Sequence, residues 1–195
     1  MRLLAVNETL PEAAQALSLL NERNESVRFG SLLGGQPSVF VFLRHFGCIA
    51  CSEHITAWKP RFAEFERLGI CIALIGNGTV EHLKGFVDRY GLAEEPVQTL
   101  TDPTLELHRM LSLKHSIAST ISPWSIKNAL RAFGHGHWQK TVEGDPMQQG
   151  GLLIVDSEKR VQLIHREKAV GDFMDVSDVF DAAVKLITLD SEEVL

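Results

Sequence analysis

Cysteine is scarce in this sequence, which has three thiols in 195 residues, at positions 48, 51 and 71. A small secreted domain held together by disulfides would need more cysteines, and an even number of them. We therefore expect a reducing, cytoplasmic setting. In that setting, two closely spaced cysteines are more often catalytic or metal-binding than structural.

Positive charge and long apolar runs are lacking as well. The chain has 19 basic against 25 acidic residues, which gives a formal net charge of −6 and a pI near 5.7. This balance argues against nucleic acid as the main partner, because a phosphate backbone is bound through an excess of basic side chains. No apolar segment approaches the roughly 18 residues of a membrane span. The apolar run at residues 1–6 is too short for a signal peptide.

The length predicts a single domain over residues 1–195, with an N-terminal helical extension over about residues 1–25. Within the extension we expect a helix at residues 11–21, with Leu17 and Leu20 on its inner side. A short strand is expected at residues 27–33.

The chemistry-bearing stretch begins with residues 39–43, a nearly unbroken apolar run typical of a strand buried on both faces. Gly47 ends this run, and Cys48 and Cys51 follow at C-x-x-C spacing. From there apolar residues recur every three or four positions, as on one face of a helix, and the stripe consists of Cys51, Ile55, Trp58, Phe62 and Phe65. The thiols are therefore expected where a buried strand turns into a helix, and Pro60 should kink that helix.

This placement favours thiol chemistry. Only the thiolate attacks a disulfide or a peroxide, and a free thiol has a pKa of about 8.5. The unpaired N–H groups and the dipole at a helix N-terminus stabilise an anion there. Because two residues separate the cysteines, the second sulfur can resolve a mixed disulfide formed by the first. We expect Cys48 to be the more exposed sulfur and the nucleophile, and Cys51 to point inward with the apolar stripe.

The rest of the sequence alternates strand and helix patterns. The expected elements are strands at 70–75 and 97–101, a helix between Thr79 and Gly91, helices starting at Asp102 and spanning 122–133, a hairpin of 152–155 and 161–165, and a closing helix at 176–187. This order predicts an α/β fold, a mixed sheet flanked by helices with a helical insertion before the final hairpin. The thioredoxin-like fold has this order and carries its C-x-x-C at the same place.

Three stretches carry a family resemblance: FLRHFGCIAC at 42–51, GDPMQQGGLLIV at 144–155 and HREKAVGD at 165–172. In this order they resemble the peroxiredoxin-like group that includes the selenoprotein-U-like proteins. That group belongs to the alkyl-hydroperoxide-reductase and thiol-specific-antioxidant superfamily. The resemblance covers roughly residues 27–189 and implies a thioredoxin fold. It also implies that Cys48 and Cys51 are the redox pair, with Cys48 where some relatives hold selenocysteine.

The resemblance leaves the attacking sulfur open. Typical peroxiredoxins carry a threonine three residues before the peroxidatic cysteine, and in that alignment Cys48 replaces the threonine and Cys51 attacks. If the chain instead follows the C-x-x-C pattern of thioredoxins, Cys48 is the nucleophile. Ile49 and Ala50 stand where family members usually have a proline and an aromatic residue.

Two further residues, Arg44 and Cys71, are candidates for a role in the thiol chemistry. Arg44 could face the thiols and favour a thiolate, or it could form an ordinary ion pair at the end of the strand. Cys71 lies in an expected buried strand and is predicted to be a core residue.

Zinc is the alternative ligand for the thiols. A structural zinc site needs four protein ligands, and the sequence has no second C-x-x-C. Histidines could complete a site only if the fold brought them together, the candidates being His45, His54, His135 and His137. We therefore expect no metal and no cofactor.

Two functions from different classes remain. The first is a thiol-dependent oxidoreductase that uses Cys48 and Cys51 to reduce peroxides, including lipid peroxides, or protein disulfides. Its partners would be a peroxide or disulfide substrate and a thiol reductant such as a thioredoxin or glutathione system. The second is a non-catalytic thioredoxin-fold module that binds partners.

Overall fold

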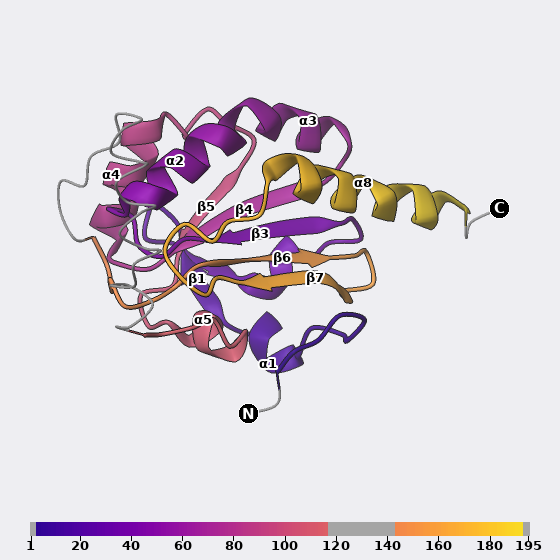
Figure 1. The fold of residues 1–195 in the computed structure, drawn as a ribbon, viewed down its shortest axis with the longest axis horizontal. Coiled ribbons are helices and arrows are strands. Elements are labelled where there is room, and N and C mark those ends of the chain that lie inside the picture. The colour runs from indigo at the N-terminus through magenta and orange to yellow at the C-terminus, as the bar shows by residue number, and fades with distance from the viewer. Residues whose placement is uncertain (1–2, 117–142, 193–195) are drawn as a thin grey trace.

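The computed structural model describes residues 3–116 and 143–192, without the side chains of 49 and 188–192. Among these residues a seven-stranded mixed sheet forms the centre of the molecule, with the order β2-β1-β5-β4-β3-β6-β7 (Figure 1). The strands are β1 (Ser18–Leu20), β2 (Ser26–Arg28), β3 (Ser38–Phe42), β4 (Cys71–Gly76), β5 (Gln98–Thr101), β6 (Gly151–Val155) and β7 (Val161–Arg166). This confirms the expected α/β fold with a thioredoxin-like mixed sheet.

The central strand β3 pairs in parallel with β4 and antiparallel with β6. Its last residue, Phe42, lies opposite Ile75 of β4 and Gly151 of β6. Gly151 in turn lies opposite Arg166, the last residue of β7. The ends of β3 and β7 therefore meet at one edge of the sheet.

Helices cover both faces of the sheet (Figure 1). One face carries α2 (Ile49–Trp58), α3 (Phe62–Arg67), α4 (Val80–Tyr90) and α8 (Val176–Glu192). The other carries α1 (Glu12–Gln15) and α5 (Glu106–Met110). Because side chains alternate along a strand, Val39 and Val41 pack against the first group, and Phe40 and Phe42 against the second. Burial on both faces explains why the β3 sequence is an unbroken apolar run.

The helix that follows the thiols is broken at Pro60, as its sequence predicts. Helix α2 ends at Trp58, a 3-10 turn (η2, Lys59–Arg61) contains the proline, and α3 continues the direction of the chain. Proline lacks the backbone N–H that an α-helix needs at an interior position, so the chain leaves α-helical geometry there.

The N-terminal helix expected at 11–21 is wrong over most of its length. Helix α1 ends at Gln15, and β1 pairs antiparallel with β2 and, through Leu20 and Thr101, with β5. Leu19 is buried at 1% exposure, while Leu17 and Leu20 are only partly buried. Burial of Leu19 against the sheet outweighs the helix propensity of the segment. The extension at about 1–25 is therefore a short helix plus a strand of the main sheet.

The strand expected at 27–33 is also shorter than predicted. Strand β2 ends at Arg28, and a 3-10 helix (η1, Phe29–Leu32) follows. Phe29 is fully buried and its ring packs on Phe40, with 4.7 Å between ring centroids. The 3-10 helix η1 thus places the Phe29 ring in the core rather than at the edge of the sheet.

The helix expected to start at Asp102 begins only at Glu106, because Asp102 lies outside the helix and its carboxylate accepts the first helical N–H groups. The other strands and helices expected within the described residues are confirmed, with ends that differ by a residue or two, except that α8 continues to Glu192. Thr79 caps α4, accepting the N–H of His82, and Gly91 ends it with a φ of +58°. The β6–β7 hairpin and α8 form as predicted. The helix expected at 122–133 lies outside the described residues, and one domain over 1–195 stays a prediction. No helix among the described residues is long and apolar enough to cross a membrane.

The two chain segments that flank residues 117–142 are joined by backbone hydrogen bonds. Ser116 N–H donates to the Met147 carbonyl at 2.9 Å, and Gln149 N–H donates to the Lys114 carbonyl at 2.8 Å. Between them His115 and Gln148 form an antiparallel bridge. The residues that lead into β6 therefore lie beside the residues that follow α5.

Candidate active site

The two cysteines lie where the chain passes from β3 into α2. Cys48 is the N-cap residue of α2, with extended backbone, and its carbonyl accepts the Ser52 N–H at 3.1 Å. Cys51 lies in the first turn and joins the core stripe beneath the helix, as expected. Cys48 is 3% exposed and Cys51 1%. Both thiols are thus buried, and exposure hardly separates them.

Arg44 faces the thiols, which is the first of the two interpretations of its position. Its Nη1 lies 3.3 Å from the Cys48 Sγ, and Nη2 donates to the Pro146 carbonyl at 2.6 Å. The side chain is 4% exposed. Burial opposes its charge, but the neighbouring Cys48 and Cys51 raise the pKa of Arg44, so a buried guanidinium cation faces the sulfurs.

The electrostatics of the two thiols differ in sign. A hydrogen bond from the Cys51 thiol, followed by the charge of Arg44, lowers the pKa of Cys48 well below that of an ordinary thiol, against the effect of burial. The same hydrogen bond, together with burial, raises the pKa of Cys51 well above the ordinary range. The arrangement favours a thiolate on Cys48 and a thiol on Cys51.

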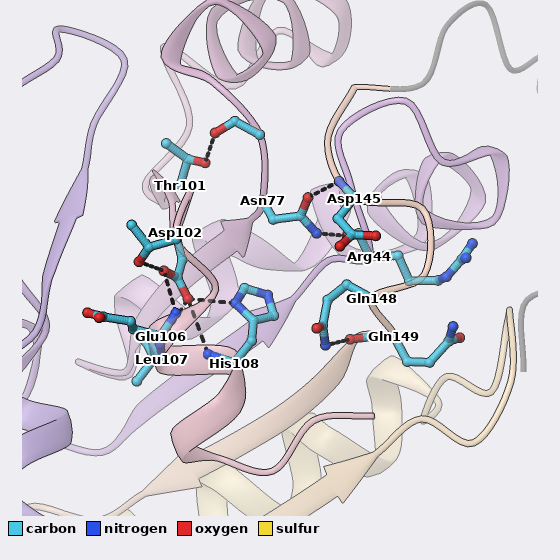
Figure 2. A network of polar contacts seen from close by, with 12 residues as sticks. Arg44, Asn77, Thr101, Asp102, Glu106, Leu107, His108, Asp145, Gln148 and Gln149 are labelled. Atoms are coloured by element: carbon cyan, nitrogen blue, oxygen red, sulfur yellow. Dashed lines mark hydrogen bonds and ion pairs between the residues drawn. The ribbon is translucent and has the colours of Figure 1, made fainter. Parts of the chain in front are cut away.

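Asn77 holds the loops of this site together (Figure 2). It follows β4 and is 2% exposed. Its side-chain amide donates to the Arg44 carbonyl, and its Oδ1 accepts the backbone N–H of Asp145 at 2.5 Å. Arg89 of α4 adds a second link, with Nη2 2.8 Å from Glu143 Oε1 and Nη1 3.1 Å from the Phe46 carbonyl. The segment before β6 is thereby fixed against the loop that carries Arg44.

Asp102, directly after β5, is a buried helix cap beside the site (Figure 2). Its carboxylate accepts the backbone N–H groups of Glu106, Leu107 and His108 at 3.0–3.2 Å. The Nδ1 of His108 lies 2.8 Å from its Oδ2. Burial opposes ionisation of Asp102, but the hydrogen bond and charge of His108 outweigh it and lower the pKa of the carboxyl.

Glu167 is a second buried carboxyl, which the sequence interpretation did not single out. It follows β7 directly, and its N–H donates to the Gly150 carbonyl at 3.2 Å. The residue is 3% exposed, and its Oε2 has no hydrogen-bond partner among the described residues. Burial, and then the charge on Cys48, raise the pKa of Glu167 well above the ordinary range. The available signal was its place in the HREK stretch at the end of a strand.

The candidate ligands that the structure describes do not form a metal site. No group of three or more histidine, cysteine or acidic side chains within 3–116 and 143–192 could hold a metal ion. His54 is buried in α2, where its Nε2 accepts the Trp58 Nε1–H at 2.8 Å, and burial lowers its pKa to about 3. His45 is 2% exposed next to Cys48, and burial lowers its pKa. His135 and His137 lie outside the described residues.

Cys71, at the start of β4, is only half-buried and therefore less enclosed than expected for a core residue. Burial raises its pKa. It lies at the opposite end of β4 from Asn77, and so away from the thiol pair.

Comparison with known families identifies the group. The sequence model of the family described as AhpC/TSA antioxidant enzyme matches residues 58–169, more than half of the chain. The match begins after Cys51. It therefore supports the family assignment but does not include Cys48 and Cys51.

Named relatives cover most of the chain. Human "Peroxiredoxin-like 2C" is 30% identical over 183 residues, covering 88% of this chain and 79% of its own length. The "Prostamide/prostaglandin F synthase" of Salmo salar is 30% identical over 165 residues, covering 81% and 80%. The "Thioredoxin-like protein AAED1, chloroplastic" of Arabidopsis thaliana is 23% identical over 180 residues, covering 88% and 71%.

Solved structures agree on the fold. Reduced Prx3 of Vibrio vulnificus in complex with hydrogen peroxide superposes with a TM-score of 0.66 at 16% identity, over 93% of this chain and 99% of that one. A cysteine-to-serine mutant of PrxQ from Xylella fastidiosa superposes with a TM-score of 0.68 at 9% identity, over 97% and 99%. The chain belongs to the AhpC/TSA antioxidant enzyme family, as a peroxiredoxin-like protein with a thioredoxin-like fold.

Proposed function

We propose that this protein is a thiol-dependent peroxidase in which Cys48 attacks the peroxide and Cys51 resolves the product. The observation that carries the proposal is the placement of Cys48 at the N-cap of α2, with the Arg44 guanidinium 3.3 Å from its sulfur. A helix N-terminus and a cation both stabilise a thiolate, which is the reactive form. Within the same proposal, Cys48 takes the place of the selenocysteine found in selenoprotein-U-like relatives.

The reaction consists of two steps on the protein. The Cys48 thiolate attacks one oxygen of the hydroperoxide, the O–O bond breaks, and the leaving alkoxide takes up a proton to become an alcohol. Cys48 is then a sulfenic acid. The Cys51 thiol attacks that sulfur, an S–S bond forms, and the hydroxyl leaves as water together with the thiol proton. Two external thiol groups, from one dithiol or from two monothiols, return two electrons and two protons to the disulfide, and Cys48 releases one of these protons to become a thiolate again.

The substrate class and reductant follow from this chemistry. We propose an organic or lipid hydroperoxide, or hydrogen peroxide, as the oxidant, and a thioredoxin or glutathione system in a reducing compartment such as the cytoplasm as the electron source. A protein disulfide could enter the same cycle, with the mixed disulfide on Cys48 in place of the sulfenic acid.

Stoichiometric oxidation tests the proposal. One equivalent of hydroperoxide added to the reduced protein should convert Cys48 and Cys51 into an intramolecular disulfide and leave Cys71 reduced. Peptide mass spectrometry after alkylation reads this outcome directly. Free thiols persisting at both positions would sink the peroxidase proposal.

Single variants assign the attacking sulfur. Cys51→Ser should keep a thiol that reacts rapidly with iodoacetamide at pH 7 and should trap a sulfenic acid, whereas Cys48→Ser should react slowly. Cys71→Ser is the matched control and should behave as wild type. If Cys48→Ser retains the rapidly reacting thiol, Cys51 is the peroxidatic residue, as the peroxiredoxin alignment has it.

A non-catalytic binding module is the second candidate, and burial of both sulfurs favours it. At 3% and 1% exposure, neither thiol is open to a bulky substrate in this conformation. A peroxidase that acts on a bulky hydroperoxide must therefore expose a sulfur further, while a binding module need not. Lack of turnover with hydrogen peroxide and with cumene hydroperoxide, in the presence of a thioredoxin system, would favour the module.

A further inference from the structure

The Glu167 carboxyl occupies the space that a side chain at Gly150 would fill. An ideal Cβ built on Gly150 would lie 2.6 Å from the Glu167 Oε1 and would also run into the Phe42 carbonyl. Gly150 therefore lets the carboxyl pack against the backbone where β3, β6 and β7 end. Arg44 follows Phe42 by two residues, so the carboxyl and the guanidinium belong to the same edge of the sheet.

In the described part of the chain, Arg44 is the buried cation beside the thiols and Glu167. Arg44 is a buried cation in contact with Cys48, and Glu167 interacts electrostatically with Arg44, Cys48 and Cys51. One guanidinium can balance one buried anion there. Two anions beside this guanidinium would leave one buried charge uncompensated, which is strongly unfavourable.

We propose that Glu167 exchanges its proton in step with the redox state of the thiol pair, so that Arg44 always faces one anion. In the reduced protein that anion is the Cys48 thiolate, and Glu167 is a neutral acid. When Cys48 and Cys51 form a disulfide the thiolate disappears, and Glu167 ionises to take its place. Glu167 is a positioning residue in this scheme, because it acts through the charge it presents to Arg44 and the sulfurs. The inference rests on the proposed redox function.

The proton balance makes the idea measurable. Oxidation of a Cys48 thiolate, a Cys51 thiol and a Glu167 carboxylic acid gives a disulfide and a Glu167 carboxylate. It releases two electrons to the oxidant and two protons, one from Cys51 and one from Glu167. Without a titrating carboxyl, the same oxidation releases only the Cys51 proton.

Other titratable groups face Glu167 and must be kept constant. Asp172, in the turn before α8, raises the pKa of Glu167 by its charge. His45 interacts with Cys48 and Arg44, and burial lowers its pKa. Neither is altered in the variants below, so both contribute equally to wild type and variant.

The test is the pH dependence of the disulfide potential, measured between about pH 6 and about pH 7.5, below the pKa of free thiols. A two-proton oxidation changes the equilibrium constant a hundredfold per pH unit, or about 59 mV, and a one-proton oxidation tenfold, or about 30 mV. We expect the steeper slope for wild type and the shallower slope for Glu167→Gln.

Two variants serve as controls. Glu167→Asp keeps a carboxyl and should restore the steeper slope. Glu158→Gln removes an exposed carboxyl in the β6–β7 turn, with a side chain 62% exposed, and should match wild type. Equal slopes for wild type and Glu167→Gln would overturn the inference while leaving the peroxidase proposal intact. Absence of any Cys48–Cys51 disulfide would overturn both.

A spectroscopic readout does not depend on the potential. The infrared difference spectrum between reduced and oxidised wild type should show loss of the C=O stretch of a protonated carboxylic acid on oxidation. The band should be missing in Glu167→Gln and shifted in Glu167→Asp. A carboxylic acid band that survives oxidation unchanged would contradict the proposal.

Discussion

Two carboxyls of nearly equal burial end up in opposite states. Asp102 after β5 is 2% exposed and Glu167 after β7 is 3% exposed, and both follow strands that run in the direction of β3. Asp102 accepts three backbone N–H groups and faces His108, and its pKa is lowered. Glu167 has an oxygen without a hydrogen-bond partner in the described part of the chain, and its pKa is raised. At similar exposure, the donors around Asp102 outweigh the effect of burial on its pKa, whereas burial and the charge on Cys48 prevail at Glu167.

Among the substitutions that test this comparison, Asp102→Asn should have the largest effect on the free energy of unfolding. The amide brings an NH₂ group among donors that need an acceptor and removes the charge that they stabilise. We expect a loss of about 3 kcal/mol in the free energy of unfolding, measured by urea denaturation. Asp88→Asn, on an exposed position of α4, is the control and should cost little. A loss below about 1 kcal/mol for Asp102→Asn would show that the cap is not a charged one.

Gly150→Ala should destabilise the protein by about 2 kcal/mol, the usual effect of overpacking. The new methyl group would push against Glu167 and the Phe42 carbonyl. Gly34→Ala is the matched control, since a Cβ at Gly34 meets no atom within 4 Å. Thermal unfolding of both variants checks the difference, and equal melting temperatures would argue against the tight packing of the Glu167 carboxyl.

Arg44→Met should slow alkylation of Cys48 at pH 7 about tenfold, equivalent to about 1.4 kcal/mol. Loss of the guanidinium removes both the hydrogen bond to Sγ and the positive charge that favours the thiolate. Arg61→Met is the control, because Arg61 pairs with Glu64 and lies over the Phe180 ring, away from the thiols. Iodoacetamide rates from pH 5 to 9 measure the effect. Unchanged alkylation rates in Arg44→Met would show that Arg44 does not contribute to the reactivity of Cys48.

Glu167→Gln should have the smallest net effect on stability at neutral pH, within about 1 kcal/mol, because two consequences oppose each other. The amide loses the contact of a carboxyl with the Gly150 backbone, but it also removes a buried acid. Since the folded pKa of Glu167 is raised, its protonated form stabilises the fold below the unfolded pKa of about 4.3, and this contribution is lost as pH rises through the folded pKa.

The sign of the pH dependence therefore separates the two carboxyls. The stability of Glu167→Gln relative to reduced wild type should increase from about pH 4 to about pH 8. Asp102 has a lowered pKa, so its contribution is present above the unfolded pKa and is lost on acidification. The cost of Asp102→Asn should accordingly shrink toward low pH. Urea titrations at several pH values measure both trends, and trends of the same sign would refute the contrast.

The sequence predicts those parts of the fold that local patterns determine. The β3 run, the β6–β7 hairpin and the periodic α4 and α8 were recognisable because their apolar spacing has a single structural solution. The segment at 17–20 was not, because LSLL fits a helix stripe or a strand, and only the pairing of Leu20 with Thr101 of β5 decides. Short apolar runs are ambiguous in this way until their long-range partner is known.

The same distinction between local patterns and long-range pairing applies to the residues of the candidate site. Cys48, Cys51 and Arg44 lie within eight consecutive positions, so spacing and strand parity suffice to bring them together. Glu167 reaches them only because β7 pairs with β6 and β6 with β3, a relation between segments far apart in sequence. Its charge state depends on donors that it lacks, which no sequence pattern reports.

The backbone hydrogen bonds that join Ser116 to Met147 and Lys114 to Gln149 make the stretch between them a natural graft point. With both stems already held in register, doubling the length of a flexible connection between them would cost only about 0.6 kcal/mol in loop-closure entropy. A different sequence could therefore be spliced in there without disturbing the stems. The same arrangement would let related chains vary the sequence between these stems while keeping one sheet.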